Sequence, residues 1–228
     1  MNFSRYAVYF TLPDGPLARF GASWLGWNAA TGERMDPPHV DGLPAPAHSL
    51  SETPRKYGLH GTIKPPFRLA YGADYDGLRA ALARLCASRP PVLLDGLALT
   101  RLGGFLALTA TGDTAALGAL AGDVVRSLDD FRAPLSDGEM ARRRKSGLTP
   151  RQDALLQSWG YPYVMEEFRF HITLTSRLGR ADAERTRVAL DSHLSPLLPH
   201  PFAIDGLTLC GEDENGLFHE LHRYALSA

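Results

Sequence analysis

The sequence predicts an α+β fold in which two similar lobes, each an antiparallel sheet flanked by helices, enclose a central cleft. The chain has 228 residues, which lies between one large domain and two small ones. Hydrophobic residues make up 44% and charged residues 21%, which is enough apolar surface to form a sizeable core. The same order of elements, strand, helix, strand, strand, is predicted twice along the chain. We therefore expect one bilobal domain over residues 1–228 with pseudo-two-fold packing.

The N-terminal part is predicted to contain a strand, a helix and a long loop. Residues 5–12 (RYAVYFTL) are rich in β-branched and aromatic residues and stop at the turn sequence Pro13-Asp14-Gly15. Pro16 can open a helix, and apolar side chains continue at helical spacing as far as Trp27. Residues 31–55 hold five prolines and are expected to form a long loop.

The first repeat is placed at about residues 57–112. Its patterns predict, in order, a strand at 59–69 interrupted by Pro65-Pro66, an amphipathic helix at 74–87, and a hairpin of strands at 92–100 and 105–111.

A linking insert at about 113–166 has a different texture. A helix is predicted at 114–128, and residues 131–151 then contain six basic side chains and two acidic ones. This stretch is expected to form a short helix followed by a second one, for which Thr149 is the N-cap and Pro150 the first helical residue. Residues 161–163 (YPY) are typical of a loop.

The second repeat is placed at about residues 167–228. A strand is predicted at 168–175, a helix at 181–193 and a final hairpin at 202–210 and 217–226. The repeats also match in detail, since Asp95-Gly96-Leu97 begins 35 residues after His60 and Asp205-Gly206-Leu207 begins 34 residues after His171. Two repeats are too few for a solenoid, which favours two packed lobes.

Composition excludes several classes of protein. The 24 Lys and Arg residues nearly balance the 25 Asp and Glu residues, which argues against a long nucleic-acid footprint or a membrane-surface protein. No uncharged run exceeds thirteen residues, and the N-terminus lacks the apolar core of a signal peptide. Cys86 and Cys210 are far apart and are expected to be buried, with no zinc-site spacing. A cytoplasmic protein is expected.

Each repeat places a His-x-Thr motif on its first strand, as His60-Gly61-Thr62 and His171-Ile172-Thr173. Because strand side chains alternate, the His and Thr of each motif point to the same face. Eight His and thirteen Thr in 228 residues give about 8 × 13/228 ≈ 0.5 such motifs by chance, and two occur at the same point of a repeat. For either motif alone, the simpler alternative is an ordinary strand histidine that forms hydrogen bonds within the fold and has no catalytic role.

Two such pairs facing each other across a cleft suit in-line displacement at phosphorus. One neutral histidine can take a proton from the attacking oxygen, and the other, protonated, can give one to the leaving oxygen. The threonine hydroxyls can donate hydrogen bonds to the non-bridging oxygens. This chemistry needs no metal and no cofactor, and no metal site is predicted.

Further side chains are predicted to bind the substrate. Lys64 could share the face of His60, and Thr175 could extend the face of His171. The basic stretch at 142–145, with Arg142 and Arg143 foremost, could close over an anion. Four tyrosines could stack on a base or cap the cleft: Tyr6, Tyr57, Tyr161 and Tyr163. Each has a plain alternative. Lys64 could be a solvated lysine and Thr175 an ordinary strand residue. The stretch 142–145 could be a solvated helix face, and the tyrosines could pack in the core or at the rim.

With these motifs the chain resembles the 2H phosphoesterase superfamily, whose mark is two His-x-Thr/Ser motifs, one in each lobe. It is most similar to the DUF1045 branch, described as a phosphonate-metabolism protein and found with carbon–phosphorus lyase genes. The matching stretches are RYAVYF, WLGW, PRKYGLHGTIKPPFRL, FRAPL, WGYPYV and FRFHITLT. Gly61 departs from the superfamily, which usually has a hydrophobic residue there; position i+1 should point away from the cleft.

The resemblance implies a bilobal fold with His60, Thr62, His171 and Thr173 as the active residues. The expected function is a metal-independent phosphodiesterase acting on a cyclic phosphate of a ribose-like or nucleotide metabolite. The expected partner is that small phosphorylated molecule, with long nucleic acid and membrane disfavoured. Two alternatives remain open: a non-catalytic protein that binds a nucleotide or phosphorylated metabolite, and an RNA end-processing or 2′-5′ ligase-like enzyme.

Overall fold

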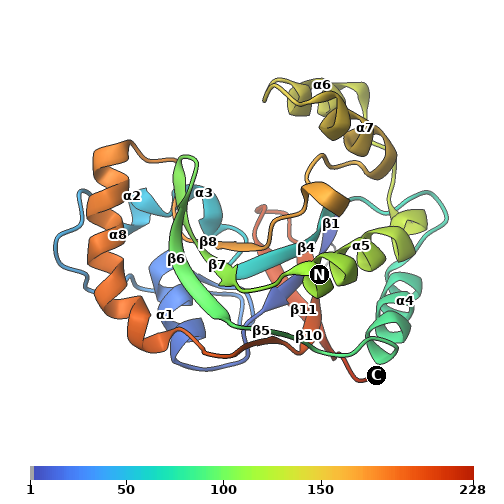
Figure 1. The fold of residues 1–228 in the computed structure, drawn as a ribbon. Helices are drawn as coiled ribbons and strands as arrows, with labels where there is room; N and C mark the ends of the chain where they lie inside the picture. The colour runs from blue at the N-terminus through green and yellow to red at the C-terminus, as the bar shows by residue number, and fades with distance from the viewer. Residues whose placement is uncertain (1–2) are drawn as a thin grey trace.

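The fold is built on one seven-stranded antiparallel sheet, seen in a computed structural model that describes residues 3–228 (Figure 1). The strand order is β11-β10-β1-β4-β8-β7-β6. The strands are β1 (Arg5–Thr11), β4 (His60–Phe67), β6 (Gly96–Leu102), β7 (Phe105–Thr111), β8 (His171–Thr173), β10 (Gly206–Glu212) and β11 (Phe218–Ala225). The predicted α+β class with antiparallel pairing is confirmed.

The prediction of two separate sheets is wrong, because β4 and β8 pair directly. Gly61 of β4 is the register partner of Ile172 of β8, so the two His-x-Thr motifs meet at the middle of one sheet. The close approach depends on Gly61, since a Cβ there would lie 2.3 Å from the ring of Phe170. That ring belongs to the main hydrophobic core, so position 61 points away from the pocket side of the sheet, as expected.

The strand order interleaves the two sequence repeats. The hairpin β6–β7, which follows the His60 strand in sequence, pairs with the His171 strand β8. The hairpin β10–β11, which follows the His171 strand, pairs through β1 with the His60 strand β4. Each half of the sheet is thus assembled from both repeats.

Helices cover the sheet on the side away from the pocket described below. Helix α4 (Tyr75–Ala87) packs on β10 and β11, and α5 (Ala115–Ser127) packs on β4. Helix α8 (Arg180–Leu194) packs on β6 and β7 at the other end of the sheet (Figure 1). No helix within residues 3–228 combines the length and the apolar character needed to cross a membrane.

Several elements differ in extent from the prediction. Helix α1 (Pro16–Leu25) stops at Gly26, whose left-handed φ of 76° forms the C-cap, so Trp27 lies in the short strand β2 (Trp27–Asn28). The expected loop at 31–55 contains β3 (Glu33–Arg34), which pairs with β2, and the short helices α2 (Ala47–Leu50) and α3 (Glu52–Arg55). The start of each predicted hairpin separates into its own strand, and β5 (Val92–Leu94) pairs with β9 (Phe202–Ile204). Strand β8 has three residues where eight were expected.

The basic insert forms an arm that projects from the body (Figure 1). It consists of α6 (Asp137–Arg144) and α7 (Pro150–Trp159), each begun by a capping box. The predicted N-cap at Thr149 and the N-terminal proline at Pro150 are confirmed. Three short 3₁₀ turns complete the fold: η1 (Asp129–Phe131), η2 (Met165–Glu167) and η3 (Ser195–Leu197).

Candidate active site

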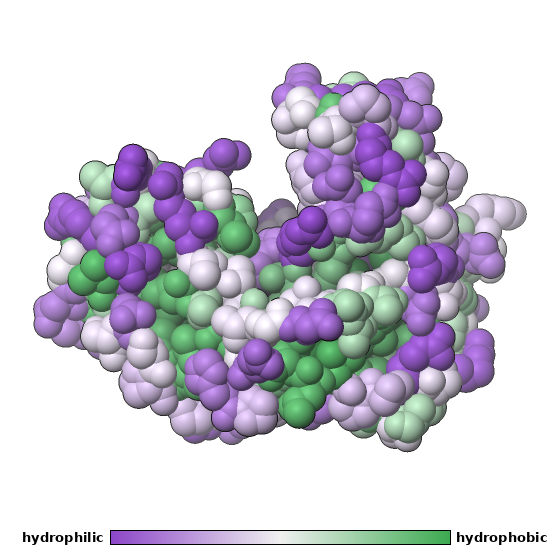
Figure 2. Space-filling view, in the orientation of Figure 1, coloured by the Kyte–Doolittle hydropathy of each residue, from purple (hydrophilic) through white to green (hydrophobic). Residues whose placement is uncertain are grey.

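Both His-x-Thr motifs line a single pocket with a volume of about 330 Å³. Its floor comes from β1, β4 and β8, and its walls come from α3, the arm helix α6 and the loop that follows α7. The surface is hollowed between the lobe that carries α8 and the projecting arm (Figure 2). Strand alternation placed the His and Thr of each motif on one face, and the pocket contains all four of these side chains.

The histidines are held by the same local contact. The Nδ1 atom of His60 lies 3.0 Å from the carbonyl oxygen of Gly58, and the Nδ1 atom of His171 lies 2.7 Å from that of Arg169. A carbonyl oxygen can only accept, so Nδ1 carries the proton in both rings and donates to it. In the neutral form of each ring, the lone pair is then on Nε2, which can accept a proton. The internal repeat therefore extends to the backbone atom two residues before each histidine.

His60 is set up to accept a proton. Thr62 Oγ1 lies 3.1 Å from its Nε2 and donates its hydroxyl to it. The ring is covered by Tyr9, with centroids 4.0 Å apart, and by Tyr57 at 5.5 Å. Burial lowers the pKa of His60 to about 4, and positive charge on His171 lowers it further while the Gly58 carbonyl opposes the shift. His60 is consequently neutral at neutral pH, with the lone pair on Nε2.

The sequence analysis missed two side chains of β1 that line the pocket, Arg5 and Tyr9. Arg5 donates from Nε and Nη2 to the carboxylate of Glu212, which is 6% exposed. The hydroxyl of Tyr9 is buried and has no hydrogen-bond partner among residues 3–228. Alternation along the strand was the available signal, since it puts residues 5, 7 and 9 on one face.

Tyr6 was predicted to bind substrate, but the structure does not bring it to the two-histidine pocket, because it lies on the opposite face of β1. Its ring packs against Tyr75 of α4 at 5.8 Å between centroids, and the side chain is 8% exposed. Both faces of β1 carry aromatic residues, so the sequence did not show which one faces the pocket.

Lys64 was also expected in the pocket, and a β-bulge removes it. Tyr9 pairs with Thr62 but Val8 pairs with Lys64, so β4 contains one extra residue between these positions. The bulge turns Lys64 to the face of Val8, where it is 2% exposed. Its Nζ donates to the Val125 carbonyl oxygen of α5 at 3.1 Å and lies 3.5 Å from Asp129. Burial lowers the pKa of Lys64 to about 8, with Asp129 opposing the shift.

Thr175 and Arg142 lie outside the pocket as well. Thr175 is 1% exposed, and its Oγ1 accepts a hydrogen bond from the Leu106 backbone N–H at 2.9 Å, so it joins the chain after β8 to β7. Arg142 is exposed on α6. The remaining predicted binding residues do line a cavity. Tyr57, Arg143 and Tyr161 line the two-histidine pocket, and Tyr163 lines its neighbour.

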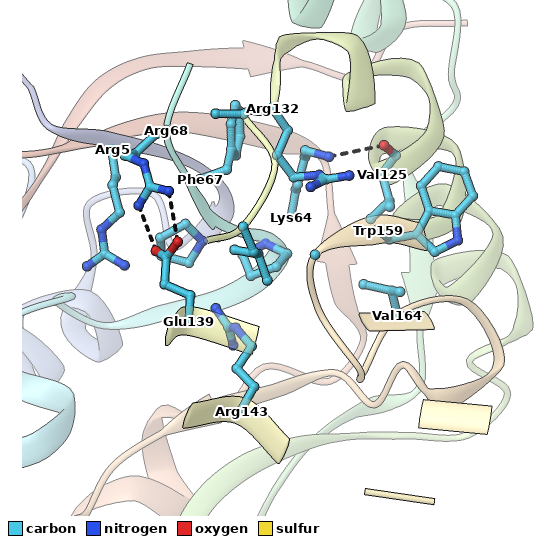
Figure 3. A pocket seen from close by; sticks show the side chains of 15 residues that line it. Arg5, Lys64, Phe67, Arg68, Val125, Arg132, Glu139, Arg143, Trp159 and Val164 are labelled. Atoms are coloured by element: carbon cyan, nitrogen blue, oxygen red, sulfur yellow. Dashed lines mark hydrogen bonds and ion pairs between the residues drawn. The ribbon is translucent and has the colours of Figure 1, made fainter. Parts of the chain in front are cut away.

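Two cavities adjoin the two-histidine pocket. One, of about 480 Å³, shares Thr62, Tyr161 and His171 with it and is lined by further aromatic rings, those of Phe105, Tyr163 and Phe168. The other has a volume of about 30 Å³, shares Arg5 and Arg143, and also meets Lys64, Arg68, Arg132 and Glu139 (Figure 3). Within residues 3–228, no three His, Cys, Asp or Glu side chains are grouped as metal ligands.

Comparison with known proteins decides the family. A family model described as "Protein of unknown function (DUF1045)" matches residues 62–219. The chain is a DUF1045 protein. This confirms the family predicted from the sequence, and the matched segment begins two residues after His60.

Two curated relatives of this DUF1045 chain are both called ribose 1,5-bisphosphate phosphokinase PhnN. The protein of Janthinobacterium sp. (strain Marseille) is 41% identical over 221 residues, which cover 94% of this chain and 49% of the relative. The protein of Laribacter hongkongensis (strain HLHK9) is 34% identical over 222 residues, which cover 96% of this chain and 51% of the relative. The chain thus spans about half the length of the curated relatives it matches.

Solved structures are similar over the full DUF1045 chain. E. coli LigT complexed with NADP+ is 16% identical, with a TM-score of 0.45 and 100% of both chains covered. A crystal structure described as a phosphoesterase is 20% identical, with a TM-score of 0.42 and the same coverage.

Proposed function

We propose that this DUF1045 protein is a metal-independent phosphodiesterase, a hydrolase that opens a cyclic phosphate on a ribose-like or nucleotide metabolite. One observation carries the proposal. The two His-x-Thr motifs line one pocket, and each histidine has its Nδ1 proton tied to a carbonyl, which leaves both Nε2 atoms for proton transfer. This is the arrangement that acid–base catalysis at phosphorus requires.

The pKa of His60 supports its assignment as the base. Neutral His60 accepts a proton from water at Nε2 while the water oxygen forms a bond to phosphorus. The ring P–O bond breaks in line with this attack, and protonated His171 donates a proton to the departing ribose oxygen. Net, one water is consumed and a phosphomonoester forms.

The threonines stabilise the charge on the phosphoryl group. Thr173 and Thr62 donate hydroxyl hydrogens to its non-bridging oxygens, where negative charge accumulates in the transition state. In the free protein Thr62 donates to His60, so substrate binding exchanges that bond for one to phosphate and releases Nε2 to the attacking water.

The names of the relatives support a phosphorylated ribose as the ligand, since a ribose bisphosphate is named in both. The kinase activity in those names belongs to proteins about twice this length, and the histidine pair gives no reason to assign it here. A role in phosphonate metabolism rests on the family resemblance.

The test is a panel of cyclic phosphates, comprising nucleoside 2′,3′-cyclic phosphates and ribosyl 1,2-cyclic phosphate, followed by phosphorus NMR in EDTA. We expect turnover of at least one compound by the wild type. His60→Ala and His171→Ala should each lower kcat by about 100-fold or more, whereas His39→Ala, at an exposed loop position, should not.

Full activity in both single variants would refute the two-histidine mechanism. Tight binding by calorimetry without product would favour the binding-protein alternative. Turnover restricted to RNA ends, with affinity that falls steeply as salt rises, would favour the RNA end-processing alternative.

A further inference from the structure

The two-histidine pocket is lined by two arginines that a cyclic phosphate alone does not use, and one of them, Arg5, is paired with Glu212. Its lining contains two arginines and two histidines, and no carboxylate among the described residues. A cyclic phosphodiester carries one negative charge, which protonated His171 and the two threonines can accommodate. Arg5 and Arg143 remain at the pocket without a role in that reaction.

These two arginines lie where the pocket adjoins the small cavity. They are the charged residues that it shares with the small cavity beneath the arm, whereas it shares Thr62 and His171 with the aromatic cavity. Arg143 also stacks on Tyr161, which the pocket shares with the aromatic cavity, so both arginines lie beside the space that holds the two His-x-Thr motifs. The small cavity, at about 30 Å³, has room for only about two water molecules, whereas the two-histidine pocket offers the arginines about 330 Å³.

Both guanidinium groups are held in place before a ligand arrives. Arg5 donates hydrogen bonds from Nε and Nη2 to the Glu212 carboxylate. Its Nη1 has no protein partner within residues 3–228. Arg143 stacks over the ring of Tyr161 at 5.0 Å, and no carboxylate among the described residues pairs with it. Arg143 is thus an oriented cation without a counter-charge.

The arm fixes Arg143 through its neighbour on the same helix face. Glu139 lies four residues earlier on α6 and forms two hydrogen bonds with Arg68, of 2.6 and 2.8 Å (Figure 3). Residues four apart share a face of a helix, so this pair turns both side chains towards β4. Arg142, one position earlier, is exposed and lines neither cavity.

We propose that Arg143 and Arg5 bind a second phosphoryl group of the substrate, so that the substrate class is a pentose cyclic phosphate with a further phosphomonoester. Two guanidinium groups from different elements suit a tetrahedral dianion, because each can donate to separate oxygens. A volume of about 330 Å³ falls within the range of roughly 300–1,000 Å³ of small-molecule sites. The inference rests on the proposed function for the identity of the first phosphate.

The test compares two ligands that differ only in the second phosphate, ribose 1,2-cyclic phosphate with and without a 5-phosphate. Dissociation constants are measured by calorimetry in EDTA, with His171→Ala as the background so that neither ligand turns over. The 5-phosphate should tighten binding by about tenfold or more, and Arg143→Gln should remove most of that gain. Arg142→Gln makes the same charge change on the same helix and should preserve it. Arg5→Gln is less suitable because it leaves Glu212 buried and unpaired.

Equal affinity for the two ligands, failure of both to bind, or equal losses in Arg142→Gln and Arg143→Gln would each overturn the second-phosphate site. The readout is binding, so it is separate from catalysis. Preference for the 5-phosphate without hydrolysis by the wild type would refute the proposed function alone, and hydrolysis without that preference would refute this site alone.

Discussion

The low pKa of His60 gives a prediction that can be measured directly. Burial beneath Tyr9 and Tyr57 is the main cause of the shift to about 4. Tyr57→Ala removes one of these rings and admits water to the imidazole. We expect the pKa of His60 to rise by about one unit in this variant, because hydration favours the charged form.

The size of the effect follows from the neutral fraction of the base. With a pKa of about 4, about 90% of His60 is neutral at pH 5, whereas a histidine with the ordinary value near 6.5 is only about 3% neutral there. The wild type should therefore keep most of its kcat/KM at pH 5. In Tyr57→Ala the neutral fraction of His60 at pH 5 should fall to about one half. The acid limb of the kcat/KM profile should therefore move to higher pH by about one unit.

The assay pairs kinetics with a direct titration. The kcat/KM profile is recorded from pH 4 to 9 at constant ionic strength, and the His60 ring is followed by NMR in the same buffers. Unfolding should take up a proton between pH 4 and 6.5, because the folded pKa lies below the unfolded one, so stability should fall as pH is lowered through that window. An NMR pKa for His60 above 6, or one that Tyr57→Ala does not change, would refute the reasoning.

Three substitutions test the packing around the pocket. Gly61→Ala drives a methyl group into Phe170 and should cost about 1–3 kcal/mol, seen as a lower Tm of roughly 2–4 °C per kcal/mol; an unchanged Tm would show that β4 and β8 can separate without cost. Lys64→Met replaces a buried amine on the face of β4 that packs against α5, and it should leave KM unchanged. A large rise in KM would show that Lys64 contacts the substrate. Thr175→Val leaves the Leu106 N–H without its acceptor and should cost about 1–3 kcal/mol in denaturant unfolding, while a selective loss of kcat in a fully stable variant would contradict its structural role.

Much of the candidate site could be predicted because its signals are local. The His-x-Thr motifs recur in register, and alternation along a strand is enough to put His60 with Thr62 and His171 with Thr173. The cap at Thr149 is likewise a matter of neighbouring residues. Tyr57, Arg143 and Tyr161 were found by residue type and reach the pocket from separate segments.

The errors arose where the outcome depends on pairing between distant segments. Lys64 has the spacing of a pocket residue, and only its register with Val8 reveals the bulge that turns it away. Tyr6 and Tyr9 are equivalent by type, and the helices packed on one face of the sheet decide which of them faces the pocket. Thr175 continues the pattern of β8, but the strand ends at Thr173 and the chain then turns to bond Leu106.

The sequence alone identified the candidate catalytic residues of this DUF1045 protein: two histidines, each with a threonine, at matching points of a repeat, on strands of an α+β fold. These features follow from residue type and short spacing, which fix side-chain direction within one element. The tertiary structure decided that the repeats interleave in one sheet, that Arg5 and Tyr9 line the pocket, and that His60 is half-buried and neutral. Strand order, register and burial depend on contacts between segments far apart in the chain, and no local pattern contains them.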